Sequence, residues 1–300
     1  MHIFVTGGSG QTGPAVVAEL VAAGHNVTGL ARSDAAAARL KSLGATPHRG
    51  SLDEHDSLRR GAEVADGVLH MAYGGDFSDL DDMMRHDRTA IEALGEPLEH
   101  SGKPLAITLV MPAGRESTEK DEPDTAGIAA FRIAGERACL DFAARGVRAS
   151  VVRLAPTVHG PEDHGFIPML IATARKTGVS AYVGDGTNRW PAVHRLDAAV
   201  LFRLALEKAP AGSVLHGAAE SGVTMKSIAQ TIARGLDLPT VSLAPEQAAG
   251  HYVSPFMARV YGFDAPVSSA HTQDLLGWSP AHPTLLDDLE HGDYLATPTS

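Results

Sequence analysis

The chain lacks paired cysteines, a long apolar run and the features of a secretion signal. Its 300 residues include a single cysteine, Cys139, so no disulfide can form within the chain. This suits a reducing compartment. No stretch approaches the roughly 20 apolar residues of a membrane-spanning helix, and the start, MHIFVTGG, leads directly into an expected strand. We therefore predict a cytoplasmic protein that does not bind membranes.

Positive charge is also scarce. Asp and Glu number 36 against 25 Lys and Arg, which gives a formal net charge of -11. No run rich in Lys or Arg stands out, and an acidic surface repels the phosphate backbone of nucleic acids. We therefore predict that nucleic acids are not partners. A local positive site for a small anionic cofactor is compatible with this charge.

What the chain does have is a regular alternation of expected strands and helices. Hydrophobic residues make up 44% of the composition, enough for a large core. Short apolar runs that are typical of buried strands alternate with segments whose apolar residues follow helical spacing. Such βαβ units predict an α/β fold, with a parallel sheet covered by helices on both faces. The expected strands are 3–6, 26–31, 46–48, 67–72, 105–110 and 149–154, and the expected helices are 14–23, 33–43, 57–61, 85–101, 129–145, 196–208 and 225–236.

A glycine-rich turn follows the first expected strand. Gly7, Gly10 and Gly13 form a G-x-x-G-x-x-G pattern between a strand and an amphipathic helix, with Ser9 inside the turn. The first glycine allows a sharp turn, the second lets the backbone approach a pyrophosphate, and the third lets helix and strand pack closely. Unpaired N–H groups at the start of the helix attract phosphate. The pattern predicts a dinucleotide site in a doubly wound, Rossmann-type sheet.

The end of the second expected strand indicates which dinucleotide binds. An NAD site needs a carboxylate there to bind the ribose 2′-hydroxyl, but the chain has Ala31 followed by Arg32 and Ser33. A guanidinium and a hydroxyl can both donate hydrogen bonds to a 2′-phosphate. We therefore predict NADP(H) in preference to NAD(H). In the alternative interpretation Arg32 is an ordinary surface side chain, and the nearby Asp34 can cap the next helix.

The alternation of expected strands and helices becomes less regular after Pro156, where Gly and Pro become frequent. We predict a dinucleotide-binding domain at 1–157, to which 179–202 returns. The ranges 158–178 and 203–300 are expected to form a smaller C-terminal lobe that binds the substrate.

Six segments, in their order and spacing, resemble the extended short-chain dehydrogenase/reductase superfamily, in its epimerase/dehydratase-like branch. The likeness spans nearly the whole chain. It implies a small organic molecule as the substrate, and a homodimer formed through the two helices expected near 85–101 and 129–145. The segments are TGGSGQTG at 6–13, GSLDEHDSL at 50–58, VLHMAY at 68–73, VVRLAPTVHGP at 151–161, WPAVHRLDAA at 190–199 and LGWSP at 276–280.

The resemblance also implies the contacts with the cofactor. Backbone N–H groups of Gln11 and Thr12 would bind the pyrophosphate. Ser51 and Leu52 stand where the family contacts adenine, although the family usually has Asp at the position of Ser51, which weakens that contact. Pro156 and Val158 would pass near the nicotinamide. The residues expected to line the cofactor after the fourth strand are Met71, Ala72 and Tyr73.

The chain departs from the family at the catalytic residues. Reductases of the family use a Tyr-x-x-x-Lys pair, in which Tyr exchanges the proton and Lys lowers its pKa. Here Ile128 stands at the Tyr position and Arg132 at the Lys position. The serine or threonine expected after the strand at 105–110 is missing too, because Thr108 comes early. The usual acid/base apparatus is therefore absent.

Another group must then carry the proton. Tyr73 follows the fourth expected strand, at the edge where doubly wound sheets bind ligands. Histidines titrate in the useful pH range, but the chain has 15 of them, so any one can be structural instead. Arg132 is no proton donor and would hold the ribose or a substrate carboxylate. The candidate catalytic residues are Tyr73, Arg132, His159 and His194, and we predict no metal site.

These observations favour an NADP(H)-dependent oxidoreductase that acts on a carbonyl or hydroxyl group of a small organic molecule. The cofactor would supply the difficult chemistry and the protein the orientation. Two alternatives stay open. One is a nonredox enzyme, such as an isomerase, lyase or cyclase. The other is a redox-silent protein that senses NADP(H), which the missing Tyr-Lys pair would favour. The fold alone does not choose among the three.

Overall fold

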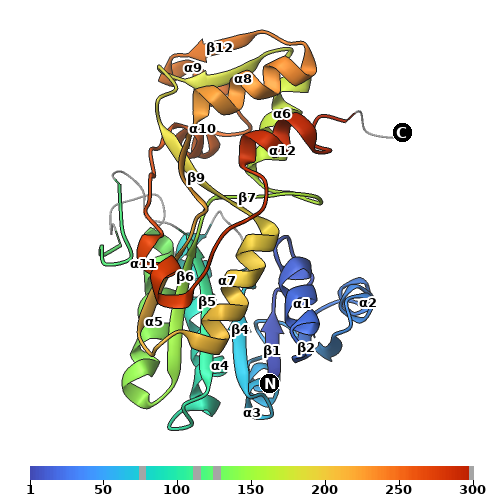
Figure 1. Ribbon diagram of the computed structural model, residues 1–300, viewed down its shortest axis with the longest axis vertical. Helices are drawn as coiled ribbons and strands as arrows, with labels where there is room; N and C mark the ends of the chain where they lie inside the picture. Colours follow the sequence, from blue (N-terminus) through green and yellow to red (C-terminus); the bar gives the residue numbers. More distant parts are fainter. Residues whose placement is uncertain (74–78, 111–115, 124–129, 297–300) are drawn as a thin grey trace.

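The computed structural model describes residues 1–73, 79–110, 116–123 and 130–296. Within them the largest sheet has seven parallel strands in the order β10-β6-β5-β4-β1-β2-β3 (Figure 1). The strand order reverses beside β1, which lies between β2 and β4. The predicted doubly wound, parallel α/β fold is thus confirmed. The strands are β1 (His2–Thr6), β2 (Asn26–Ala31), β3 (Thr46–Arg49), β4 (Gly67–His70), β5 (Pro104–Val110), β6 (Arg148–Leu154) and β10 (Ser213–Gly217).

Helices cover both faces of this sheet, because successive side chains of each strand point to opposite faces. In β1, Ile3 and Val5 enter one core and Phe4 enters the other. The first core also receives side chains from α1 (Gly13–Ala22), α2 (Asp34–Ser42), α7 (Arg195–Lys208) and α11 (Ala270–Leu276). The second receives them from α3 (His55–Glu63), α4 (Leu80–Gly95) and α5 (Ile133–Asp141).

Two of the helices on the second face are shorter than expected. The helix predicted at 85–101 is α4, which ends at Gly95 and is followed by the 3-10 turn Glu96–Leu98. Pro97 has no N–H to continue the α-helical hydrogen bonds. The helix predicted at 129–145 consists of the 3-10 turn Ala130–Arg132, then α5, then the 3-10 turn Phe142–Arg145.

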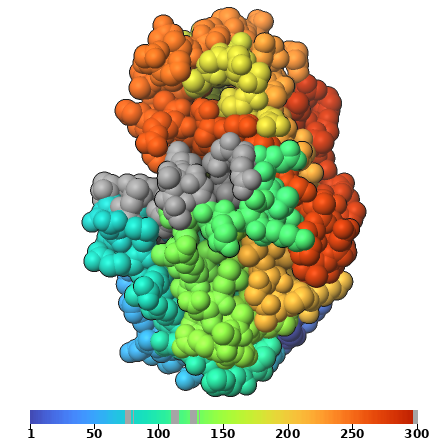
Figure 2. Space-filling view, turned by 90° about the vertical axis from the view of Figure 1, so that its left-hand side faces the viewer, coloured from blue at the N-terminus to red at the C-terminus, as the bar shows by residue number. Residues whose placement is uncertain are grey.

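Smaller sheets and further helices form a second part, stacked on the first along the long axis of the molecule (Figures 1 and 2). Its core is centred on Trp190, whose ring stacks on Tyr261 and Phe263 at 5.6 and 5.4 Å. The strand orders are β11-β9-β7 and β12-β8. The strands are β7 (Thr157–His159), β8 (Ser180–Val183), β9 (Arg189–His194), β11 (Glu220–Thr224) and β12 (Thr240–Leu243). The helices are α6 (Phe166–Thr177), α8 (Met225–Leu236), α9 (Pro245–His251), α10 (Pro255–Gly262) and α12 (Leu285–His291).

The range 203–300, expected in the substrate lobe, contributes to both parts. The second half of α7 packs in the first core through Leu204 and Ala205. Strand β10 pairs with β6 at the edge of the large sheet, where Leu215 is level with Val152. In the described ranges, every helix is too short or too polar to cross a membrane.

Candidate functional site

A cavity of about 650 Å³ opens at the carboxyl ends of β1, β2, β4 and β5. Doubly wound sheets bind their ligands at this edge, beside the point where the strand order reverses. The volume falls in the range of roughly 300–1,000 Å³ that is usual for small ligands and cofactors. The cavity wall consists of Gly7, Ser9, Gly10, Gln11, Thr12, Gly13, Leu30, Arg32, Ala36, Gly50, Ser51, Leu52, Asp53, Met71, Ala72, Tyr73, Asp82, His86, Asp87, Thr108, Leu154 and Phe202.

The glycine-rich turn forms the wall at the start of α1. Gly7 has φ +76°, and a Cβ on it would lie 2.6 Å from the backbone nitrogen of Ala72. A Cβ on Gly13 would lie 2.1 Å from the backbone oxygen of Gly7. Gly10 closes the turn by donating a hydrogen bond of 2.9 Å to that same oxygen. Only glycines allow this packing, which brings the free N–H groups of the helix start to the cavity.

Arg32 lies at the end of β2, in the wall and largely exposed. Asp34, the nearest acidic residue along the chain, forms an ion pair with Arg49. Ser33 is outside the wall, and its Oγ accepts a hydrogen bond of 3.2 Å from the backbone nitrogen of Ala36. Ser33 rather than Asp34 therefore caps α2, and Arg32 is the cation that this end of the cavity offers to an anion.

The other expected cofactor contacts divide into two groups. Seven of them, besides the turn and Arg32, were expected from the resemblance to lie along the cofactor, and five are in the wall: Ser51, Leu52, Met71, Ala72 and Tyr73. Pro156 and Val158 are not in the wall. Val158 is in β7, 8% exposed and packed in the first core. Leu154, two residues before Pro156, reaches the cavity in their place.

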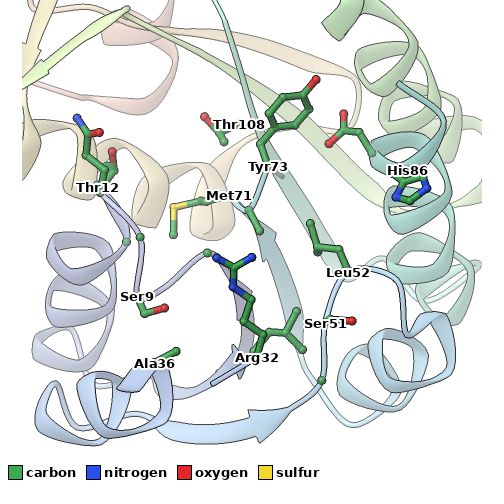
Figure 3. Close-up of a pocket in the computed structure, with 18 of the residues that line it drawn as sticks. Ser9, Thr12, Arg32, Ala36, Ser51, Leu52, Met71, Tyr73, His86 and Thr108 are labelled. Atoms are coloured by element: carbon green, nitrogen blue, oxygen red, sulfur yellow. The ribbon is translucent and has the colours of Figure 1, made fainter. Parts of the chain in front are cut away.

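Tyr73 lies at the opposite end of the cavity from Arg32, against a buried guanidinium. The Cζ of Arg132 is 3.6 Å from the centre of the Tyr73 ring, a cation–π contact. Arg132 is 6% exposed and donates a hydrogen bond of 2.8 Å to the backbone oxygen of Thr108. Arg132 is thus behind Tyr73 rather than in the wall, and the structure brings these two candidates together. Figure 3 shows the two ends of the cavity, with Tyr73 and Thr108 at one and Ser9, Ala36 and Arg32 at the other.

The protonation of Tyr73 follows from its surroundings. Burial raises the pKa of Tyr73 to about 12; the positive charge of Arg132 lowers this pKa and the negative charge of Asp87 raises it. Burial lowers the pKa of the Arg132 guanidinium, against the effect of Asp87. Tyr73 is therefore a neutral phenol near pH 7, in a state to donate a proton.

His159 and His194 lie elsewhere. They are 1% and 5% exposed and belong to a cluster between β7, β9 and α12, not to the cavity wall. His159 Nδ1 is 2.5 Å from a carboxylate oxygen of Asp288. His194 Nδ1 accepts a hydrogen bond from the backbone nitrogen of Leu196 and so caps α7, and its ring stacks on His282 at 4.8 Å. The structure gives both histidines structural contacts and separates them from Tyr73.

Several wall residues were not expected from the sequence. Thr108 is in the wall although it comes early in its strand. Helix α4 contributes Asp82, His86 and Asp87. Asp82 and His86 are four residues apart and so lie on one side of a helix, a spacing that could have indicated them. Ile128, aligned with the usual Tyr, lies outside the described residues. Among the described residues, no group of three His, Cys, Asp or Glu is arranged to hold a metal ion.

Comparisons with known proteins agree with this geometry. The NAD dependent epimerase/dehydratase family matches residues 3–216. An uncharacterized protein of Schizosaccharomyces pombe is 46% identical over 298 residues, which cover 98% of this chain and all of that protein. The 4-hydroxy-2-methyl-3-oxo-4-farnesyl-3,4-dihydroquinoline-1-oxide ketoreductase of Stigmatella aurantiaca is 28% identical over 225 residues, or 71% of this chain and 67% of that one.

A solved structure shares the fold. It is the dTDP-glucose 4,6-dehydratase DesIV of Streptomyces venezuelae, with NAD and TYD bound. Its TM-score is 0.79 at 17% identity, over 98% of this chain and 96% of that one.

Proposed function

The chain belongs to the NAD dependent epimerase/dehydratase family, within the extended short-chain dehydrogenases/reductases, and on this basis we propose that it is an NADP(H)-dependent oxidoreductase. Its substrate would carry a carbonyl or hydroxyl group on a small organic molecule. The observation that carries the proposal is one cavity with a phosphate-binding turn in its wall, the cation Arg32 at one end and the phenol Tyr73 at the other. A relative named as a ketoreductase supports it.

Each part of NADP(H) has candidate contacts among the residues of the cavity wall. The N–H groups at the start of α1 would bind the pyrophosphate. Arg32 would bind the 2′-phosphate, since a guanidinium pairs well with phosphate oxygens and the nearby Asp34 forms its ion pair with Arg49 instead. Leu52 would contact the adenine. The nicotinamide would then lie between Met71, Thr108 and Leu154, and when bound it supplies the hydride.

Tyr73 would serve as the proton donor. A phenol that is neutral at pH 7 can donate to a carbonyl oxygen. Arg132, 3.6 Å from the ring centre, would stabilise the tyrosinate that remains. His159 and His194 have no part in this step, because their partners belong to another cluster.

The cofactor preference has a direct test. We expect Arg32→Ala to weaken NADPH binding about 10-fold to 100-fold, because one charge-assisted contact with the phosphate is lost. NADH binding should change little. Titration calorimetry of both cofactors measures this, with Arg60→Ala as control, since Arg60 is exposed on α3 and outside the cavity wall. An equal loss for NADPH and NADH would contradict the assignment of Arg32 to the 2′-phosphate.

The reaction class is tested with a panel of aldehydes, ketones and alcohols. Oxidation of NADPH with a carbonyl substrate supports the proposal. Tyr73→Phe should then lower kcat by roughly 100-fold to 10,000-fold while NADPH still binds, because only the proton donor is removed. Tight binding without turnover would favour an NADP(H) sensor. Product formation without a change in nicotinamide absorbance would favour a nonredox enzyme.

We also propose a cytoplasmic homodimer. The lone cysteine, Cys139, is buried and supports a reducing compartment. Helices α4 and α5, through which the resemblance implies the dimer, lie side by side on one face of the sheet. Light scattering on the purified protein gives the mass in solution and decides between monomer and dimer.

A further inference from the structure

Two opposite charges are buried together beside Tyr73. Asp87, on α4, is 5% exposed and lies in the cavity wall. Its Oδ1 is 3.8 Å from Nη1 of Arg132, which in turn stacks on the Tyr73 ring. Buried charges are rarely found unpaired, because leaving water disfavours them strongly. The pair therefore explains how a guanidinium can stay behind this phenol.

The position of Asp87 is fixed from the side of α5 and from β4. A Cβ on Gly135 would lie 2.5 Å from Oδ2 of Asp87, so the carboxylate occupies space that only a glycine leaves free. Nε2 of His70 is 3.5 Å from Oδ1. Nδ1 of His70 is 2.7 Å from Oγ1 of Thr6, which holds the ring in place. Gly135 and His70 thus leave room for the carboxylate beside Arg132.

This arrangement changes what Arg132 can do to Tyr73. An isolated guanidinium at 3.6 Å from the ring would stabilise tyrosinate and so lower the pKa of Tyr73, against the effect of burial. The negative charge of Asp87, 3.8 Å from Nη1 of Arg132, offsets part of this effect. Resting on the function proposed above, we propose that Asp87 is a positioning residue that holds Arg132, offsets its charge and, together with the burial of the ring, keeps Tyr73 protonated, so that the cavity reduces carbonyls in preference to oxidising alcohols.

The chemistry of this direction balances. The carbonyl carbon would gain a hydride from the bound NADPH as its double bond to oxygen opens, while that oxygen would take the proton of Tyr73. The carbonyl compound would thus be reduced to an alcohol, with NADPH as the two-electron reductant. Tyr73, left as tyrosinate beside Arg132, regains a proton from water. The raised pKa of Tyr73, about 12, agrees with a group that starts the cycle protonated.

The proposal can be tested without substrate or cofactor. The titration of Tyr73 is followed by NMR with ring-labelled tyrosine, and its signal is identified by its loss in Tyr73→Phe. In the wild type the phenol should stay protonated up to about pH 10. In Asp87→Asn we expect about tenfold more tyrosinate at a given pH, because one nearby negative charge is gone. Glu92→Gln is the matched control: it removes the same charge from α4, where Glu92 pairs with Arg88 at the surface.

Three results of this titration would overturn the proposal. Ionisation of Tyr73 below about pH 9 in the wild type would overturn the proposal, and this measurement needs no variant to fold. The proposal would also be overturned if the pKa of Tyr73 were unchanged or higher in Asp87→Asn. An equal fall of this pKa in Glu92→Gln would overturn it too. Since no turnover is involved, these results do not depend on whether the carbonyl reductase activity is found.

If that activity is found, the dependence of its rate on pH gives a second test of the role of Asp87. Alcohol oxidation needs tyrosinate, so its rate should rise about tenfold per pH unit, while carbonyl reduction stays nearly flat. Asp87→Asn should raise the oxidation rate about tenfold at a given pH, and Glu92→Gln should leave it unchanged. A purely structural role of Asp87 would lower both directions together and would not move the profile.

Discussion

At the scale of single residues, Gly13 has the least room of the glycines in the turn. It begins α1, and its hydrogen points at the backbone oxygen of Gly7. Backbone atoms cannot move aside as the end of a flexible side chain can. The turn that brings the N–H groups of α1 to the cavity therefore depends on the missing side chain.

We expect Gly13→Ala to lower the free energy of unfolding by about 3 kcal/mol and to abolish NADPH binding, because the added Cβ would lie 2.1 Å from the oxygen of Gly7. Gly250→Ala is the matched control, since Gly250 is in α9 with nothing within 4 Å of its Cβ position. Alanine should stabilise that site by about 0.4–1 kcal/mol. Thermal unfolding and calorimetry measure both variants. A Gly13→Ala protein that melts with the wild type would contradict the assigned packing.

Residues that act locally were predictable from the sequence, and those that act through packing were not. Gln11 lies in the turn after β1 and Leu52 in the turn after β3, and the resemblance to the family implied both as cofactor contacts. Asp87 is in the middle of a helix, and its role depends on Gly135 and His70, which come from other elements. Thr108 was expected to come too early in its strand to reach the site, yet it lies in the cavity wall.

At the scale of elements, the segment between β7 and α6 is tied to the glycine-rich turn. Asp163 accepts hydrogen bonds from Nε2 of Gln11 at 2.8 Å, from the hydroxyl of Tyr294 at 2.7 Å and from the backbone nitrogen of Gly165 at 2.6 Å. Arg195, at the start of α7, donates to the backbone oxygen of Gln11 at 2.8 Å. The second part of the molecule thus contacts the glycine-rich turn through Asp163, and the start of α7 contacts it through Arg195.

We expect Asp163→Ala to lower the free energy of unfolding by about 1–3 kcal/mol, since it leaves three donors without their acceptor. It should also weaken NADPH binding several-fold, because Gln11 is released. Asp163→Asn keeps an acceptor of similar shape and should retain most of both. Melting temperature and calorimetry measure these effects. Asp185→Ala is the control, an exposed turn residue that accepts from Thr187; a loss there as large as in Asp163→Ala would refute the link.

The elements themselves were largely predictable. The strands of the first half were expected within a few residues, because buried parallel strands are continuous apolar runs. Strand β10 was not expected, since SVLHG offers only two strongly apolar residues, and its place beside β6 is set by α7 packing across the sheet. The small strands β8 and β12 pair across 60 residues of chain, a contact that no local pattern indicates.

At the scale of the whole molecule, buried histidines couple folding to pH. Burial lowers the pKa of His194, His216 and His251 from the ordinary value of 6.5. For His194, Asp288 and Asp197 oppose this effect, whereas His159 and His282 reinforce it. The unfolded chain therefore takes up protons at these sites at a pH where the folded chain does not. Stability rises with pH in such a window, so it must fall as the pH drops below 6.5.

The carboxylates whose pKa is shifted do not predict a loss in that window. The carboxylates whose pKa is lowered, among them Asp264 and Asp287, release stability only near and below their ordinary value of 3.8. Burial raises the pKa of Asp163, which acts in the opposite sense, since the folded chain takes up that proton first. We therefore attribute the loss of stability expected between pH 7 and pH 5 to the three histidines whose pKa is lowered.

We accordingly expect the melting temperature to fall between about pH 7.5 and about pH 5.5. His194→Asn should reduce this fall, because asparagine can still cap α7 at Leu196 but takes up no proton. His100→Asn is the control: His100 is exposed with φ +57°, a conformation that asparagine accepts, so any change there should be the same at both pH values. Calorimetric scans of the three proteins give the comparison. If the fall in His194→Asn equals that of the wild type, the charge taken up at this junction of β9, α7 and α12 is not what destabilises the fold in acid.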